Sequence, residues 1–282
     1  MKKTNNIRKL KQISNLLRQT VIKMLAKAGS GHTAGPLGMA DVFACLYFNI
    51  ANHNPKNPEW EPRDRIILSN GHICPIRYAA MAFAGYFPLS ELMTLRKINS
   101  RLQGHPHNGS LPGLETSSGP LGQGVSQAAG LALGLKMDKK NNWVYLLTSD
   151  GEHDEGQTWE AVMFAAKYKL DNLINIVDRN KIQISGSTEE IMPLNGLKEK
   201  YKAFGWHVLE INGNNVAEIL DAVKKAKQTA KSKKSPVCII AYTVPGKGVS
   251  FMENNFEWHG KTPTKVEAEE ALRQLEDERK RI

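Results

Sequence analysis

Hydrophobic positions along the chain follow two spacings, one typical of helices and one of short buried strands. Apolar residues three to four positions apart predict a helix over 7–27, and a second helix is expected over about 39–50. Runs that suit buried strands lie at 65–69, 143–149, 173–177, 206–211 and 237–243. Strands and helices in this order predict an α/β fold with a doubly wound, mostly parallel sheet and helices on both faces.

The clearest unit is a crossover between the strands predicted at 143–149 and 173–177. The helix between them is expected to pack on the sheet through an apolar stripe formed by Trp159, Val162, Met163 and Ala166. Two strands joined in this way run parallel and end at the same edge of the sheet. Because open α/β sheets bind ligands at that edge, the residues that follow the two strands are candidate site residues.

Asp150 follows the first of these strands, and Asn180 follows the second. Neighbouring strands lie about 4.8 Å apart, so both side chains can offer oxygen atoms to one ion. Hard oxygen ligands with room for phosphate oxygens are typical of a Mg²⁺ diphosphate site. Gly151 fits the same interpretation, because a residue without a β carbon lets the backbone turn tightly and approach a diphosphate.

Several loops place a histidine beside a glycine. A single loop histidine is more often exposed or structural, but this pattern recurs at four sites, which are His32, His72, His105 and His259. Imidazoles with a pKa near neutral can donate to sugar hydroxyls and shuttle protons. The gaps between them contain no local chelating pair, which argues against a metal site made of histidines.

Glycine-rich segments occur at 32–38, 118–124 and 244–248, and each is expected to form a loop. The segment at 118–124 precedes a predicted small-residue helix over 125–137. A glycine-rich loop is weak evidence for a phosphate site by itself. Within the segment at 244–248, Lys247 is a candidate for attracting an anion.

Charge narrows the possible ligands only partly. The 282 residues contain 38 Lys and Arg against 28 Asp and Glu, a formal net charge of +10. This excess fits attraction of sugar phosphates, a diphosphate or a nucleic acid, and equally a solvated basic surface. No zinc-finger spacing or RNA-binding aromatic motif supports a nucleic acid.

The cysteine content and the hydropathy of the chain indicate the cellular compartment of the protein. The 3 cysteines are widely spaced and odd in number, which matches neither a disulfide framework nor a zinc site. The N-terminus lacks a signal-peptide core, and no run of apolar residues is long enough to cross a membrane. We expect a cytoplasmic protein with a single domain over 1–282, ending in a solvated helical tail from about 263.

The stretch around Asp150 also carries a family resemblance. Asp150-Gly151-Glu152, Glu155-Gly156 and Trp159-Glu160-Ala161, followed by 172–180, resemble the thiamine diphosphate signature of the transketolase family, with Ser149 at the usual position of a glycine. The resemblance runs from about Ile7 to Gly260 and covers only the family's first domain. It implies the N-terminal subunit of a split transketolase, a diphosphate-binding domain without the pyrimidine-binding and C-terminal domains.

The resemblance also implies roles for individual residues. The cofactor would be thiamine diphosphate with Mg²⁺, or with Ca²⁺ or Mn²⁺ as substitutes. Its metal would bind Asp150, Asn180 and the backbone carbonyl of Ile182. Gly119 would contact the cofactor through its backbone and Leu121 through packing. Glu155 and Glu160 would lie at the subunit interface, although two carboxylates near a helix start can equally be solvated residues that the helix dipole favours.

By the same resemblance, the four histidines line the substrate channel, and His72 also contacts the cofactor. The reaction implied is transfer of a two-carbon ketol group from a ketose phosphate to an aldose phosphate, as in the pentose phosphate pathway. A glutamate needed for cofactor activation would come from a C-terminal subunit, in a dimer of heterodimers, so the chain is expected to be inactive alone.

Other interpretations stay open at this point. One is a split transketolase for an unusual ketose. Two others are related thiamine diphosphate enzymes, namely the α chain of a 2-oxoacid dehydrogenase and a deoxyxylulose phosphate synthase. The last is a cofactor-binding or regulatory protein without catalysis.

Overall fold

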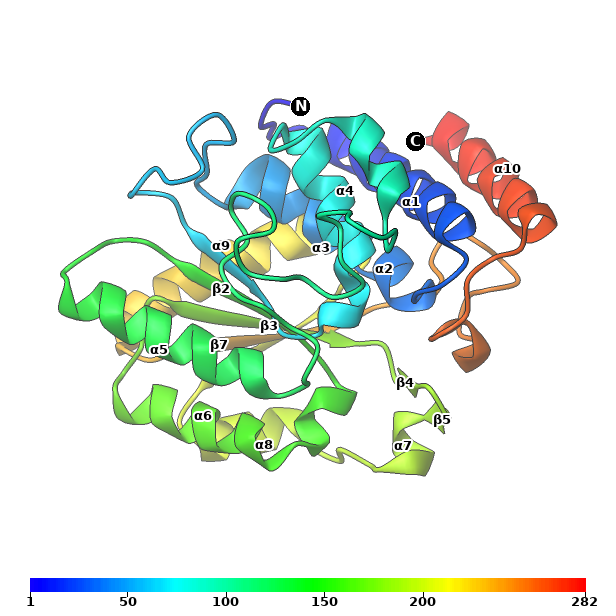
Figure 1. The fold of residues 1–282 in the computed structure, drawn as a ribbon. Helices are drawn as coiled ribbons and strands as arrows, with labels where there is room; N and C mark the ends of the chain where they lie inside the picture. Colours follow the sequence, from blue (N-terminus) through cyan, green and yellow to red (C-terminus); the bar gives the residue numbers. More distant parts are fainter.

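A five-stranded parallel sheet lies between two layers of helices in the computed structural model, which describes residues 1–282 (Figure 1). The strand order is β1-β2-β3-β7-β6, and every neighbouring pair is parallel. The strands are β1 (Arg65–Leu68), β2 (Val144–Ser149), β3 (Leu173–Arg179), β6 (His207–Asn212) and β7 (Val237–Tyr242). This arrangement confirms the predicted doubly wound α/β fold.

Helices cover both faces of the sheet. One layer contains α1 (Ile7–Ala28), α3 (Ala40–Cys45), α4 (Cys74–Ala84) and α9 (Val216–Lys233). The other contains α5 (Gln123–Met137), α6 (Gly156–Lys167) and α8 (Leu197–Ala203). Alternate residues of β2 enter the two cores, Tyr145 on the first face and Leu146 on the second. Because both faces are covered, the strands appear in the sequence as continuous apolar runs.

Short elements complete the chain at the carboxyl edge and around the helices. A π-helical turn, η1 (Leu46–Ile50), ends the predicted second helix. The 3-10 turns are η2 (Gly71–Ile73), η3 (Leu89–Thr94), η4 (Gly151–Asp154) and η5 (Phe256–Trp258). The remaining elements are α2 (Ala34–Gly38), β4 (Ile182–Gln183), β5 (Gly186–Ser187), α7 (Thr188–Ile191) and α10 (Lys265–Arg281).

The prediction of a loop at 32–38 was wrong, because most of this segment forms the buried helix α2. Pro36 lies in the first turn of α2, where its missing N–H disturbs no helical hydrogen bond. A β carbon on Gly38 would lie 3.0 Å from the carbonyl oxygen of Val244. Glycine here permits close packing and does not indicate irregular backbone.

The prediction of an apolar stripe on the helix after Asp150 was also partly wrong. Met163 was expected to face the sheet, but its side chain is 56% exposed. The buried positions of α6 are Thr158, Ala161, Val162 and Ala165. Small side chains allow α6 to approach the sheet closely. Trp159 packs against the same core, and Met163 and Phe164 are exposed on the outer face.

The C-terminal helix was expected to be solvated, and the structure corrects this as well. A face of α10 formed by Ala268, Ala271 and Leu275 is buried against the rest of the chain. The helices α1 and α10 lie side by side in Figure 1, and Asn15 Nδ2 donates a hydrogen bond of 2.9 Å to the carbonyl oxygen of Leu275. None of the helices is both long and apolar enough to span a bilayer.

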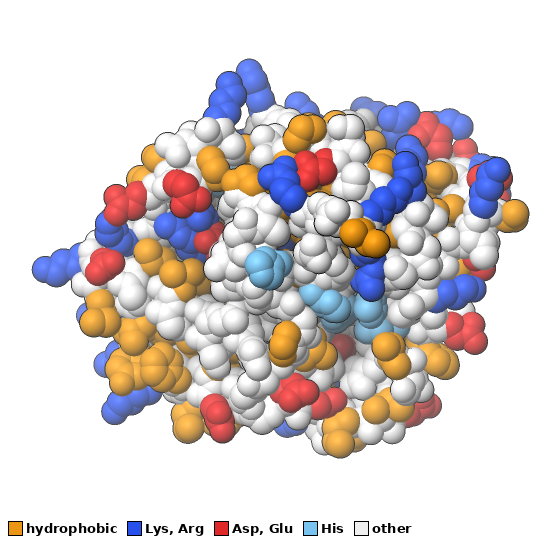
Figure 2. All heavy atoms as spheres, in the orientation of Figure 1, with side chains coloured by type: hydrophobic (Ala, Val, Ile, Leu, Met, Phe, Trp, Pro, Cys, Tyr) orange, Lys and Arg blue, Asp and Glu red, His pale blue; other side chains and the backbone are white.

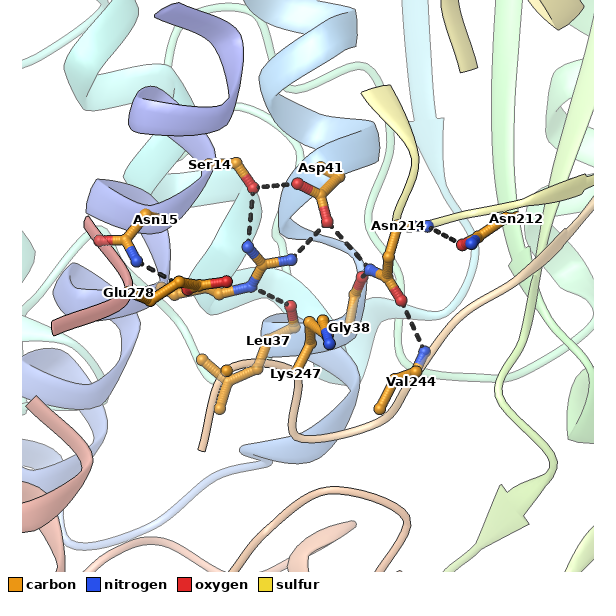
Figure 3. A network of polar contacts seen from close by, with 12 residues as sticks. Ser14, Asn15, Leu37, Gly38, Asp41, Asn212, Asn214, Val244, Lys247 and Glu278 are labelled. Atoms are coloured by element: carbon orange, nitrogen blue, oxygen red, sulfur yellow. Dashed lines mark hydrogen bonds and ion pairs between the residues drawn. The ribbon is translucent and has the colours of Figure 1, made fainter. Parts of the chain in front are cut away.

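A buried ion pair joins the helices of this layer to the β6–α9 connection (Figure 3). Arg18 of α1 pairs with Asp41 of α3, and its Nε donates to the carbonyl oxygen of Leu37 at 3.0 Å. Asn214 Nδ2 donates to Asp41 at 3.0 Å, and its Oδ1 accepts from the N–H of Val244 at 2.8 Å. The network therefore fixes the segment after β7 against α1 and α3.

Candidate active site

A cavity of about 320 Å³ opens at the carboxyl edge of the sheet. Its walls contain most of the residues that the sequence singled out, namely His32, His72, His105, Gly119, Leu121, Asp150, Gly151, Asn180, Ile182 and His259. Histidine side chains are visible near the centre of the face shown in Figure 2. The fold thus brings together residues that are spread over more than two hundred positions of the sequence.

Asp150 is held rigidly where β2 ends. Its carboxylate accepts hydrogen bonds from the N–H of Gly151 at 2.8 Å and from the N–H of Lys181 at 2.7 Å. The guanidinium of Arg179 donates to the same carboxylate at 3.1 Å. Burial raises the pKa of Asp150 to about 6, although these donors act in the opposite direction.

Asn180 lies beside Asp150 because the parallel register pairs Ser149 with Asp178. The Asn180 Oδ1 accepts from the N–H of Ile182 at 3.0 Å, and its Nδ2 donates to Asp178 Oδ2 at 2.8 Å. Asp178 is fully buried, and burial raises its pKa to about 7. The side-chain amide is therefore fixed at the turn between β3 and β4.

These oxygen atoms fit a Mg²⁺ diphosphate site. One carboxylate, one amide oxygen and the carbonyl of Ile182 would provide part of a six-coordinate shell and leave positions for phosphate and water oxygens. The chain contains no cluster of three or more His, Cys, Asp or Glu side chains that could hold a metal.

Three histidine rings from distant loops form a cluster. The ring centroid of His32 lies 4.9 Å from that of His72 and 5.6 Å from that of His259, and the last two are 5.3 Å apart. Burial, with the other histidines adding to it, lowers the pKa of His32 to about 4 and lowers the pKa of His72. The Nδ1 atoms of His32 and His259 are buried without a hydrogen-bond partner within the chain.

His105 lies apart from this cluster, against the glycine-rich loop. A β carbon on Gly119 would lie 3.5 Å from His105 Cγ, and Gly119 has a φ of 141°. A β carbon on Gly71 would lie only 3.0 Å from the backbone nitrogen of Gly119. Glycine at these two positions therefore allows the loop to approach η2 closely. Burial lowers the pKa of His105.

Glu152 is a site residue whose role the sequence did not reveal. It is fully buried, and its Oε1 accepts from the N–H of Gly122 at 2.7 Å and from the hydroxyl of Ser69. Its Oε2 accepts from the N–H of Ser149 at 3.1 Å. One carboxylate thus joins the ends of β1 and β2 to the loop before α5. The family motif contains Glu152, but nothing in the sequence indicates contacts with such distant partners.

Other candidate residues lie outside the cavity. Glu155 and Glu160 are exposed at the start of α6 and form no ion pair, so their interface role stays a prediction. Lys247, a candidate for anion binding, pairs with Glu253 at 3.2 Å instead. The walls also include Gln183 and Ile184, which the sequence analysis did not single out.

The fold and the site together define an α/β domain that binds a phosphorylated cofactor. The family model described as the transketolase thiamine diphosphate-binding domain matches residues 9–276. The chain therefore belongs to the transketolase family.

Named relatives show to which part of a transketolase this chain corresponds. The chain is 42% identical to a 6-deoxy-6-sulfo-D-fructose transketolase subunit of Clostridium sp. (strain MSTE9), over 95% of this chain and 97% of that one. It is 39% identical to an apulose-4-phosphate transketolase subunit of Phocaeicola vulgatus, over 92% of this chain and 91% of that one. Human transketolase is 37% identical over 94% of this chain, which spans 42% of the human protein.

Solved structures agree with this assignment. The transketolase of Campylobacter jejuni superposes with a TM-score of 0.90 at 35% identity, covering 96% of this chain and 43% of that one. The chain matches transketolase subunits over almost their whole length and single-chain transketolases over less than half. It is thus an N-terminal, thiamine diphosphate-binding transketolase subunit, as the sequence resemblance predicted.

Proposed function

We propose that this chain, together with a second subunit, transfers a two-carbon ketol group from a ketose phosphate to an aldose phosphate with thiamine diphosphate and Mg²⁺. The observation that carries the proposal is a single cavity in which clustered neutral histidines face the oxygen atoms of Asp150 and Asn180. The first group suits a hydroxylated substrate, and the second suits a metal diphosphate.

The residues of the cavity divide between cofactor and substrate. The side chains of Asp150 and Asn180 and the carbonyl of Ile182 would hold the metal. Thiamine diphosphate would lie against Gly151, the backbone of Gly119, and the side chains of Leu121 and His72. When bound, it supplies the nucleophilic carbon and the electron sink that a ketol transfer requires.

The other histidines would handle the protons of the sugar. A neutral imidazole can accept a proton at one nitrogen and donate from the other, so it suits a hydroxyl that gains or loses a proton. His32 and His259 line the cavity and would provide such groups there. His105 would contact the same substrate from the glycine-rich loop.

We propose further that residues 1–282 form one diphosphate-binding domain and that a C-terminal subunit supplies the pyrimidine-binding side, in a dimer of heterodimers. The outer face of α5 and α6 is the surface we assign to that partner. Both helices begin beside the cavity, and their exposed apolar side chains are Met137, Met163, Phe164 and Tyr168. Figure 2 shows hydrophobic side chains gathered at the lower left, where Figure 1 places these helices.

The same face carries Glu155 and Glu160, the predicted interface carboxylates. Added β carbons at Gly130 and Gly134 of α5 would meet nothing within 4 Å, so another backbone can approach there. The proposed setting is the cytoplasm and the sugar phosphates of the pentose phosphate pathway.

A second candidate is a split transketolase for an unusual ketose. The names of the relatives favour it, since a sulfonated deoxyfructose and apulose 4-phosphate appear among them. Both candidates share the cofactor, the reaction type and the need for a partner, and they differ only in the sugar.

Release of aldose phosphate from xylulose 5-phosphate, with thiamine diphosphate and Mg²⁺, tests the proposal. We expect turnover by the complex that a tagged chain retains from its own cells and none by the pure chain. Asp150→Ala should lower Mg²⁺-dependent cofactor binding by tenfold or more, roughly the loss of one charged ligand. Asp138→Ala, at the exposed end of α5, is the control and should bind normally.

Two results would contradict the proposal. Robust turnover by the pure chain would show that no partner is needed. A complex that binds the cofactor but cleaves no ketose, phosphorylated or sulfonated, would exclude ketol transfer as its reaction.

A further inference from the structure

The ring of His105 depends on the backbone for its position in the cavity wall. It lies against Gly119, and no hydrogen bond within the chain holds its imidazole. His153, by contrast, is fixed through both ring nitrogens, which contact the carbonyl oxygen of Ser149 and the hydroxyl of Tyr201, each at 2.8 Å. The orientation of His105 toward a ligand is therefore set by the segment that carries it.

The carbonyl groups that precede His105 are held by one side of α4. Tyr78 Oη donates a hydrogen bond of 3.0 Å to the carbonyl oxygen of Gln103. The thiol of Cys74 donates a weaker bond to the carbonyl oxygen of Gly104, with a distance of 3.2 Å from the sulfur. Both side chains are buried, and they lie four positions apart, so they project from the same side of the helix.

The same segment is also held at its two ends. The carbonyl oxygen of Pro106 accepts from the N–H of Ser118 at 3.0 Å, and Ser118 belongs to the glycine-rich loop. The carbonyl oxygen of Leu102 accepts from the N–H of Arg96 at 2.9 Å. The backbone on both sides of His105 is thus anchored within the chain, and α4 provides the only side-chain donors among these anchors.

The helix that anchors this segment begins directly after another cavity histidine. His72 lies in η2, and Cys74 is the first residue of α4. The first two turns of α4 therefore connect the backbone of His72 with the backbone of His105. A ligand that contacts both imidazoles needs them held to within about 0.5 Å of the productive geometry.

We propose that Tyr78, assisted by Cys74, is a positioning residue for His105. Its hydroxyl holds the carbonyl group of Gln103, so that the imidazole of His105 stays in the wall of the cavity. The inference rests on the proposed function, because a fixed His105 affects catalysis only if it contacts the sugar. Neither Tyr78 nor Cys74 lines the cavity, so both act through the segment that carries His105.

The position of His105 can be measured on the full chain without turnover. NMR spectra of chain with isotope-labelled histidine give the ring signals, and His105→Gln identifies those of His105. Tyr78→Phe removes only a hydroxyl, and the ring should then move away from Gly119 into water. Burial, followed by the charge of Arg96, lowers the pKa of His105, so the pKa in the variant should rise toward the ordinary value of about 6.5.

Tyr145→Phe is the matched control. Tyr145 is also fully buried, but its hydroxyl has no hydrogen-bond partner within the chain, so its loss should leave the His105 signals unchanged. Cys74→Ala, which removes the weaker donor, should shift these signals in the same direction as Tyr78→Phe. Cys74→Ser keeps a donor beside Gly104 and should restore the wild-type signals. If Tyr78→Phe does not fold, the two Cys74 variants decide the question.

A double-mutant cycle in the complex with the partner shows whether Tyr78 acts through His105. Tyr78→Phe should lower kcat for the ketose about tenfold and change the affinity for thiamine diphosphate by less than about twofold. In the background of His105→Gln, Tyr78→Phe should cause no further loss of kcat. A general disturbance of the fold would lower kcat by the same factor in both backgrounds.

The inference is overturned if Tyr78→Phe, or Cys74→Ala in its place, leaves the signals and the pKa of His105 as in the wild type. It is also overturned if Tyr145→Phe changes them equally, or if the losses of kcat from Tyr78→Phe and His105→Gln multiply in the double variant. If His105 responds as expected but the wild-type complex turns over no ketose, the proposed function fails while the positioning of His105 by Tyr78 stands.

Discussion

At the scale of single residues, the unusual feature is a group of histidines kept neutral by burial. His32 has a pKa of about 4 in the folded chain, whereas a histidine in an unfolded chain has a pKa of about 6.5. Between these values the unfolded state binds more protons, so His32 lowers the stability of the fold as pH falls from about 6.5 to about 4. Above that window its contribution is constant.

We therefore expect His32→Asn to make the free energy of unfolding less dependent on pH within this window. The difference in free energy of unfolding between the wild type and the variant should change by about 1–3 kcal/mol between pH 7 and pH 4.5. Urea unfolding at several pH values measures this difference. The titration of the carboxylates cancels in the comparison, because both proteins contain the same carboxylates. Parallel pH profiles would show that His32 titrates normally in the folded chain.

The sequence could identify site residues where a local pattern marks them. The Gly-His dipeptides and the Asp150-Gly151 turn after a strand are local patterns, and the structure places them in one cavity. Glu152 was missed because its partners lie far away in sequence. It accepts a hydrogen bond from the N–H of Gly122, so only the folded chain reveals its position.

At the scale of elements, the structure predicts that two glycines of one helix differ in their tolerance of alanine. A β carbon on Gly124 would lie 2.6 Å from the Cα of Ser69, so α5 would have to move away from β1. On Gly130 it would meet nothing within 4 Å. We expect Gly124→Ala to destabilise the chain by about 1–3 kcal/mol through overpacking. Gly130→Ala should stabilise it by up to about 1 kcal/mol, because alanine favours a helix.

Thermal or urea unfolding of the isolated chain measures both variants, and each serves as the control for the other. Gly124→Ala should also weaken thiamine diphosphate binding, since α5 follows directly on the loop of Gly119 and Leu121. If the two variants had equal stabilities, α5 would be able to shift freely, which would contradict the close contact between Gly124 and Ser69.

The strands were easier to predict than the surfaces of the helices. Each strand is a continuous apolar run because both of its faces are covered, and the structure confirms all five within two residues. Helix faces depend on what packs against them. In α6 the small residues Ala161 and Ala165 face the sheet, and Met163 does not. In α10, Leu275 is buried by a partner helix that lies more than two hundred positions away.

At the scale of the whole molecule, α5 and α6 connect the cavity with the apolar face. The segment Leu121–Gly122 leads from the cavity into α5, and η4 leads from Asp150 into α6. A partner that covered the outer face of these helices along their whole length would also reach the cavity. This geometry gives a physical reason for a split enzyme, because one association event would bury apolar surface and complete the site.

Met163→Asp tests this arrangement. Met163 is 56% exposed on the outer face of α6, so aspartate there should change the stability of the isolated chain by no more than about 0.5 kcal/mol. Binding of the C-terminal subunit should weaken by about tenfold or more, because a charge would have to enter an apolar contact. Titration of the purified partner, followed by analytical ultracentrifugation, measures the affinity.

Val266→Asp is the matched control, since Val266 is 75% exposed on α10, away from the proposed interface. It should bind the partner as the wild type does. The assignment fails if Val266→Asp weakens binding and Met163→Asp does not. If the chain alone forms a dimer that Met163→Asp dissociates, the face belongs to a second copy, and the partner subunit must reach the cavity from another side.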